Sequence, residues 1–244
     1  MSDTKKRTQN KRRRRKYRLT MRFYGILTAL FVIIVGVVLS KTLFFNITDI
    51  QFENTSPYSL EEILVVTQIH EGDNLFSMNL TKRSENLEKC LPYAGEVIMK
   101  RKLPSTIKIT VKAPEIDMNI ATDDGKFYLI SDEKKVLEKN LAKAVSGYPV
   151  IYGYEPADVN VCGTMTSESK NKKELIEEIF AAFDKNGFDN LVSVDVTNIN
   201  EIMVRHNEVQ SIRLGNSDDI DFKIELAKAI VDKRSNPNEP GTIN

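Results

Sequence analysis

The sequence of 244 residues contains no tryptophan, only two histidines and only two cysteines, Cys90 and Cys162. Two cysteines are too few for a disulfide framework, and no Cys-x-x-Cys pair or Cys/His cluster predicts a metal site. We expect both thiols to be unpaired. The alternative is a single Cys90–Cys162 disulfide, if this part of the chain lies outside the cytoplasm. The 11 glycines are scattered and form no phosphate-binding loop. The sequence therefore predicts no metal and no cofactor.

Residues that could carry catalysis are also scarce. His70 and His206 have no serine and aspartate at a recognised triad spacing, and we expect both in exposed loops. Ser131 and Ser167 each begin a Ser-x-x-Lys motif, which cell-wall enzymes use, but no Ser-Asp-Asn or Lys-Thr-Gly accompanies them. We expect no enzyme. A membrane-anchored cell-wall enzyme with Ser131 or Ser167 as nucleophile is the alternative.

The net charge of +1 conceals an uneven distribution. Residues 1–22 hold 11 Lys/Arg and one acid, Asp3, which leaves 24 basic and 33 acidic residues and a net charge of −9 in the remainder. Opposite charge in two parts of one chain indicates two different surroundings.

An uncharged apolar run follows the basic segment, from Phe23 to Ser40. At about 1.5 Å per residue, a helix over this run reaches about 27 Å, close to the hydrocarbon thickness of a bilayer. We predict a transmembrane helix over 23–45, because Lys41 can extend its side chain to the headgroups. A cleaved signal peptide is the rival, but the run exceeds a signal core of about 7–15 residues. The predicted membrane-embedded side chains include Phe23, Ile26, Leu30, Ile33, Val37 and Ser40.

The basic segment 1–22 predicts the orientation, because Lys/Arg clusters beside a transmembrane helix stay in the cytoplasm. Residues after the helix would then lie outside. The cluster could also serve as a nucleic-acid arm or an anionic-lipid patch. Membrane topology and attraction to anionic lipid are enough to explain the basic cluster, so we expect no nucleic-acid partner.

Residues 46–114 predict the order strand, helix, helix, strand, strand. Ser59 and Glu62 have the spacing of a capping box at the start of the first helix. Residues 106–112 alternate, and Ile107, Ile109 and Val111 are expected to face inward. Residues 115–234 predict a second unit of short strands with a helix around 175–183, further strands at 191–196, 202–205 and 209–214, and a final helix at 218–231. Residues 235–244 form a predicted C-terminal tail.

Two segments of the first unit carry a family resemblance. The order of its elements, directly after a membrane helix, resembles a POTRA domain, a small polypeptide-binding module. Gly72-Asp73-Asn74-Leu75-Phe76 resembles the loop between the two POTRA helices, and residues 101–109 (RKLPSTIKI) resemble the hairpin of the FtsQ/DivIB division proteins. Residues 148–153 (YPVIYG) resemble a segment of that family's β domain, with Tyr148 in place of leucine.

The resemblance implies an α+β architecture: one N-terminal transmembrane helix, a POTRA domain at 46–114, and a mixed β domain with flanking helices at 115–234. It implies a non-enzymatic scaffold of the division machinery at the septum. Its implied partners are FtsB/DivIC-like and FtsL-like bitopic proteins and, indirectly, septal peptidoglycan synthases. The implied contact residues are in the final helix and the tail: Ile224, Lys228, Val231, Gly241, Thr242, Ile243 and Asn244.

Two features depart from the family pattern. A Glu-Arg-x-Pro element often follows the last POTRA strand, and here only Lys112-Ala113-Pro114 is present. The sequence printed here ends at Asn244, about where such proteins continue into a closing strand. A POTRA-containing translocation factor is a further alternative, but such proteins normally precede an outer-membrane barrel, whose alternating strands of about 10 residues are missing from this sequence.

Overall fold

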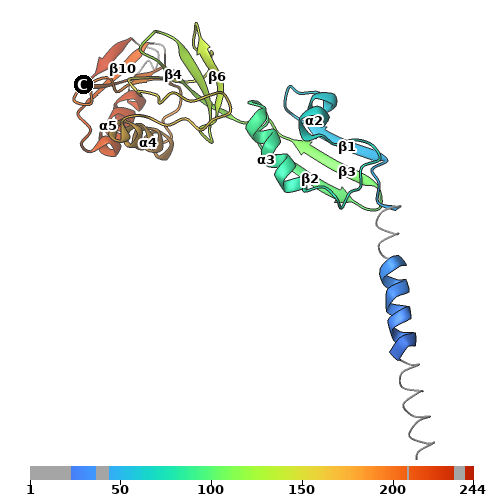
Figure 1. Ribbon diagram of the computed structural model, residues 1–244. Helices are drawn as coiled ribbons and strands as arrows, with labels where there is room; N and C mark the ends of the chain where they lie inside the picture. The colour runs from blue at the N-terminus through green and yellow to red at the C-terminus, as the bar shows by residue number, and fades with distance from the viewer. Residues whose placement is uncertain (1–22, 37–43, 208, 234–239) are drawn as a thin grey trace, which may run out of the picture. The chain divides into compact units, whose positions relative to one another are not determined.

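A computed structural model describes residues 23–36, 44–207, 209–233 and 240–244 (Figure 1). Residues 23–36 are helical, and Phe23, Ile26, Leu30 and Ile33 are exposed on this helix. Val37, Ser40 and the basic segment 1–22 lie outside the described residues. Within the described ranges, no helix is both long enough and apolar enough to cross a membrane. The transmembrane helix over 23–45 therefore stays a prediction.

Backbone contacts divide the chain into two compact units. The first comprises residues 1–52, 68–80 and 99–109, and the second comprises 53–67, 81–98 and 110–244. The structure contains a three-stranded sheet with the order β1-β3-β2 and an eight-stranded sheet with the order β11-β10-β9-β8-β7-β4-β5-β6. The larger sheet belongs to the second unit.

The strands of the smaller sheet are β1 (Asp49–Asn54), β2 (Val97–Lys102) and β3 (Thr106–Val111). The predicted alternation of β3 is confirmed, because Ile107, Ile109 and Val111 are fully buried while Lys108 and Thr110 are half-buried. A strand with one buried and one wetter face gives this pattern of period two. The order β1, α2, α3, β2, β3 along the chain agrees with the predicted POTRA order.

Helices α2 (Leu60–Thr67) and α3 (Leu80–Cys90) connect β1 to β2. The predicted capping box at the start of α2 is confirmed. The Ser59 backbone N–H donates to Glu62 Oε2 at 2.8 Å, and the Glu62 N–H donates to Ser59 Oγ at 3.3 Å. The Ser59 N–H and the Ser59 hydroxyl both donate to the Glu62 carboxylate, and these two hydrogen bonds lower the pKa of the carboxyl below its usual value. The motif therefore fixes the first turn of α2 locally.

The larger sheet is mixed, with two antiparallel groups of strands joined through one short strand. Strand β7 is parallel to β4 on one side and to β8 on the other, and β11 is parallel to β10. The other neighbouring pairs are antiparallel. The strands are β4 (Ile116–Ala121), β5 (Phe127–Ser131), β6 (Val136–Leu141), β7 (Val150–Tyr152), β8 (Leu191–Asp195), β9 (Ile202–His206), β10 (Gln210–Gly215) and β11 (Gly241–Ile243).

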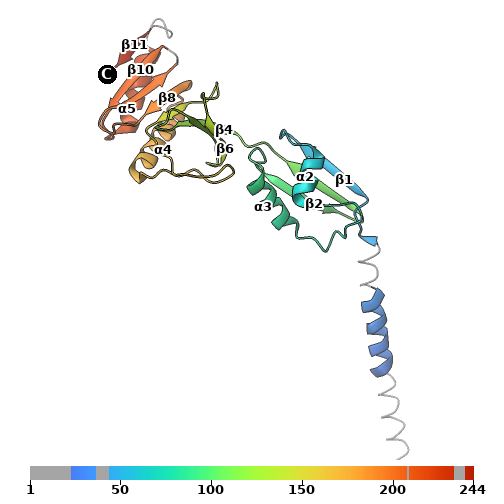
Figure 2. The same cartoon turned by 45° about the horizontal axis from the view of Figure 1, so that its top comes forward.

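Two helices, α4 (Lys170–Lys185) and α5 (Ile220–Asp232), pack side by side on one face of the larger sheet, as both views show (Figure 1, Figure 2). The predicted apolar face of α4 is confirmed, since Leu175, Ile176, Ile179 and Phe183 are buried and Phe180 packs against the same cluster. A stripe with this spacing must cover apolar surface. The sheet and both helices therefore share one hydrophobic core.

Candidate partner-binding sites

The C-terminal strand β11 is one edge of the larger sheet. It pairs in parallel with β10 through Gln210–Gly241, Ser211–Thr242 and Ile212–Ile243. Ile243 is buried in the core, which holds the short strand on the sheet, whereas Thr242 and Asn244 are exposed. An edge strand presents a row of backbone groups that another strand can pair with.

The direction of the backbone groups of β11 follows from one hydrogen bond. The Gly241 N–H donates to the Val209 carbonyl oxygen at 3.3 Å, so this N–H points toward β10. Successive N–H groups of a strand point to opposite sides, and the Thr242 N–H therefore points away from the sheet. The outer side of β11 is suited to main-chain pairing with a partner.

Helix α5 divides the predicted contact residues between its inner side and its flank. Ile224 and Val231 are buried in the core beneath the helix, so their side chains do not face solvent. The Lys228 ammonium lies 2.8 Å from Asp232 Oδ1 and 5.7 Å from the ring centre of Phe188. Of these three residues, only Lys228 has a side chain that reaches the surface of the helix.

The outward side of α5 contains two large apolar residues that the sequence reasoning missed. Phe222 is 64% and Leu226 is 51% exposed. They are four residues apart and thus lie on one face of the helix. Their spacing of four residues could have predicted a second apolar face. The apolar residues at 220, 224, 227 and 231 form a longer stripe on the other side of the helix, and that stripe is buried.

His206 lies at the end of β9, and its predicted place in an exposed loop is wrong. Its side chain is buried, with the ring centre 4.3 Å from that of Phe188. Its Nε2 lies 3.0 Å from the side-chain nitrogen Nδ2 of Asn207, and its Nδ1 has no hydrogen-bond partner among the described residues. Burial lowers the pKa of the imidazole, because a buried site disfavours the charged form.

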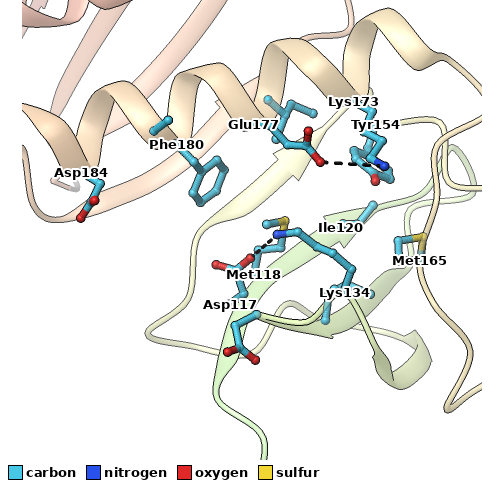
Figure 3. A pocket seen from close by; sticks show the side chains of 14 residues that line it. Asp117, Met118, Ile120, Lys134, Tyr154, Met165, Lys173, Glu177, Phe180 and Asp184 are labelled. Atoms are coloured by element: carbon cyan, nitrogen blue, oxygen red, sulfur yellow. Dashed lines mark hydrogen bonds and ion pairs between the residues drawn. The ribbon is translucent and has the colours of Figure 1, made fainter.

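A pocket of about 420 Å³ opens between α4 and the strands β4 and β5 (Figure 3). Its lining is mostly apolar, with Met118, Ile120 and Phe180 among the side chains that point into it. Two ion pairs lie at its rim: Lys134 Nζ is 2.7 Å from Asp117 Oδ2, and Lys173 Nζ is 3.9 Å from Glu177 Oε1. An apolar concavity with a few charged groups has the general character of a ligand-binding site.

The serines of the Ser-x-x-Lys motifs are not placed beside their lysines. Ser131 is buried, and its hydroxyl oxygen accepts a hydrogen bond from the Lys135 N–H at 3.1 Å, while the ammonium of Lys134 pairs with Asp117. The Ser167 hydroxyl donates to the Tyr154 carbonyl oxygen. Lys170 Nζ lies 3.3 Å from Glu174. Neither motif is arranged as a nucleophile and base.

Cys90 and Cys162 are both unpaired thiols. Burial raises the pKa of the Cys162 thiol above its usual value, which disfavours the reactive thiolate. Across the described ranges, no three His, Cys, Asp or Glu residues are grouped so that they could hold a metal ion.

The loop and the hairpin that carry the POTRA resemblance lie against each other. Arg101 Nε donates to the Leu75 carbonyl oxygen and Nη2 to that of Met78, each at 2.6 Å. The Arg101 guanidinium carbon is 5.8 Å from the ring centre of Phe76. One arginine of the hairpin therefore holds the loop at 72–78.

Comparison with known proteins finds relatives for both parts of the chain. A family described as "POTRA domain, FtsQ-type" matches residues 45–112. The chain is 27% identical over 190 residues to a cell division protein DivIB of Clostridium tetani, with 77% of this chain and 70% of that protein covered. It is 28% identical over 193 residues to the DivIB of Clostridium acetobutylicum, with 78% and 75% covered. The chain is similar to the FtsQ/DivIB family of cell-division proteins.

The similarity to DivIB proteins reaches beyond the FtsQ-type POTRA region. An alignment of 190 residues cannot fit within residues 1–112, so it extends well into the eight-stranded sheet. A cell division protein FtsQ of a Geobacter species is 28% identical over 153 residues, with 61% of this chain and 52% of that protein covered. The similarity to cell-division proteins therefore covers both the POTRA region and part of the eight-stranded sheet.

Proposed function

We propose that this FtsQ/DivIB-like chain is a non-enzymatic, single-pass membrane scaffold of the bacterial division machinery. The observation that carries the proposal is the combination of an FtsQ-type POTRA region with an accessible edge strand, β11, in the second sheet. Ser131 and Ser167, the only serines that sequence motifs suggested as nucleophiles, are engaged in backbone hydrogen bonds. Binding, rather than chemistry, is what this arrangement supports.

The anchor and orientation of the proposed scaffold rest on the sequence. The apolar run from Phe23 to Ser40 supports a transmembrane helix over 23–45, and the basic segment 1–22 supports a cytoplasmic N-terminus. The POTRA domain at 46–114 and the β domain at 115–234 would then lie outside the membrane, at the division septum.

The proposed partner interface is the outer edge of β11 together with the outward face of α5. A strand from an FtsB/DivIC-like protein adds to β11 through main-chain hydrogen bonds. Phe222 and Leu226 offer apolar surface for a helix of that protein or of its FtsL-like companion. Through these proteins the scaffold would influence septal peptidoglycan synthases, and the POTRA domain is the proposed recruitment surface.

Localisation tests the division role. We expect a fluorescent protein fused before Met1 to form a midcell band in dividing cells that appears late in the cycle. Uniform membrane fluorescence from an intact and functional fusion would contradict the proposal.

A proline at position 242 tests the interface. Thr242→Pro removes the outward N–H of β11 without removing a bond to β10, and edge strands tolerate proline. Because a backbone hydrogen bond contributes about 1 kcal/mol, we expect affinity for the DivIC-type protein of the source cell to fall about fivefold. Thr242→Val is the matched control, since it retains the N–H and the side-chain shape, and it should bind like the wild type. Equal affinity of the two variants would exclude strand addition at β11.

A further inference from the structure

Three exposed apolar side chains lie at one end of the first compact unit, on three different segments. They are Phe44 (69% exposed), Phe76 (45%) and Leu103 (59%). Phe44 is the first described residue after the apolar run that ends at Ser40, Phe76 lies in the loop between α2 and α3, and Leu103 is in the β2–β3 turn. A single exposed apolar residue is ordinary, but a group of large ones indicates an interaction surface.

Ring contacts and backbone hydrogen bonds bring the three segments together. The ring centres of Phe45 and Phe76 are 5.0 Å apart, and the Leu75 N–H donates to the Phe45 carbonyl oxygen at 2.8 Å. The β2–β3 turn joins the same end, because the Thr48 N–H donates to the Ser105 carbonyl oxygen at 2.9 Å. Figures 1 and 2 both show this turn and the loop before α3 beside the start of β1.

The hairpin also contributes positive charge. Residues 99–108 contain Lys100, Arg101, Lys102 and Lys108 and no acid, and the first three are exposed. Arg101 is engaged with the loop, whereas Lys100 and Lys102 are on the opposite side of β2. The neighbouring loop carries two acids, Glu71 and Asp73, so the positive charge is concentrated on the hairpin.

Chain length determines what can cover this end of the unit. Ser40 is the last residue of the uncharged run, and Phe44 follows it four positions later. Four residues span at most about 14 Å even when fully extended. If the apolar run of the predicted helix over 23–45 spans the hydrocarbon as far as Ser40, Phe44 lies within that distance of the membrane boundary. Phe45, which contacts Phe76, is the last residue of the predicted helix.

We propose that Phe44, Phe76 and Leu103 form a lipid-contact surface that seats this end of the POTRA region on the outer face of the membrane. This inference rests on the membrane anchor of the proposed function. Aromatic and aliphatic side chains enter the interfacial zone, and nearby lysines favour anionic headgroups. The surface restricts the orientation of the POTRA region relative to the bilayer.

Lipid quenching tests the surface in the full chain. The protein, with Cys90→Ser and Cys162→Ser, is placed in nanodiscs of phosphatidylethanolamine and phosphatidylglycerol, and a bimane label is attached at Leu103→Cys. Lipids with a nitroxide at the headgroup or upper acyl chain quench labels at the interface. We expect several-fold stronger quenching at position 103 than at the control label Val161→Cys, which is also an exposed apolar site. Equal quenching at both positions would overturn the inference.

A second variant separates a lipid contact from mere proximity. Phe44→Ser should reduce the quenching at position 103, whereas Val65→Ser, at another exposed apolar position of the same region, should leave it unchanged. An unchanged signal in Phe44→Ser would overturn the surface. Co-elution of the chain with nanodiscs reports the anchor separately. A chain that elutes without nanodiscs contradicts the anchor and therefore the inference as well.

Discussion

The guanidinium of Arg101 donates a hydrogen bond to the backbone carbonyl oxygen of Leu75 at 2.6 Å. A second donor of the same group bonds the carbonyl oxygen of Met78. The fixed fork of an arginine can satisfy two carbonyl groups at once, which a lysine ammonium cannot do with the same geometry. The loop between α2 and α3 is therefore attached to the hairpin by a side chain from strand β2.

Arg101→Lys should lower the free energy of unfolding by about 1–2 kcal/mol, because at least one charge-assisted hydrogen bond to a loop carbonyl is lost. Chemical denaturation of the protein in detergent micelles measures the change. The adjacent exposed residue provides the control, and Lys100→Gln should alter stability by less than about 0.5 kcal/mol. Similar losses in both variants would contradict the role of Arg101.

Gly153→Ala should destabilise the β domain strongly. Gly153 has a φ of +75°, and a Cβ there would lie 2.4 Å from the Thr197 backbone nitrogen. We expect a loss of more than about 3 kcal/mol, measured by chemical denaturation. Gly125→Ala is the matched control, because Gly125 has a φ of +77° but open space at its Cβ position. That variant should lose only about 1 kcal/mol, the cost of the left-handed conformation.

The stability of the protein should fall as the pH decreases below about 6.5, the usual pKa of histidine. Burial lowers the pKa of His206 in the folded state, so the unfolded chain binds the proton more readily between the folded pKa and the unfolded value. The unfolding free energy therefore rises with pH across that window and becomes constant above it. Asp189, Lys228 and Asp232 are the charged groups near the ring.

His206→Phe tests that assignment by denaturation at a series of pH values. The variant retains a ring against Phe188 and removes the titrating group, so its stability should depend less on pH than that of the wild type. His70→Phe, at an exposed position, should retain the wild-type dependence. An unchanged slope in His206→Phe would show that another group is responsible.

Asn119→Leu should destabilise the connection between the two halves of the larger sheet. The fully buried Asn119 amide donates to the carbonyl oxygens of Val145 (3.0 Å) and Tyr148 (3.2 Å), and its oxygen accepts the Val145 N–H at 2.8 Å. Leucine leaves these backbone groups unpaired at a cost of about 3 kcal/mol. Hydrogen exchange of residues 145–152 should accelerate, whereas Ile243→Val should leave the exchange of this segment unchanged.

Much of the local structure could be predicted because its causes are local. The capping box at Ser59 and the alternation at Ile107 and Ile109 are encoded within a few residues, and both are confirmed. The burial of His206 was missed because the sequence does not show whether this residue ends the strand or begins the turn. A shift of one residue along a strand moves a side chain from the buried face to the exposed face. Local sequence does not specify it.

The candidate binding surfaces were only partly predictable. The segment at Gly241–Asn244 was identified from a family resemblance, whereas its parallel pairing with β10 depends on contacts between distant residues. On α5, Ile224 and Val231 are apolar and suited to binding, but the sheet determines which side of the helix is covered. The pocket at Met118 and Phe180 joins two segments about 60 residues apart, and no short-range pattern predicts it.

The short strand β7 has a mechanical consequence. It is paired with β4 at only two positions, Asn119–Val150 and Ile120–Ile151, and with β8 at three. The β4–β6 ladder and the β8–β11 ladder are longer and are joined through this strand. Tension applied along the chain between the two ladders would concentrate on these few rungs. Under a pulling force, we expect the backbone pairings of β7 to break before those of the two longer ladders.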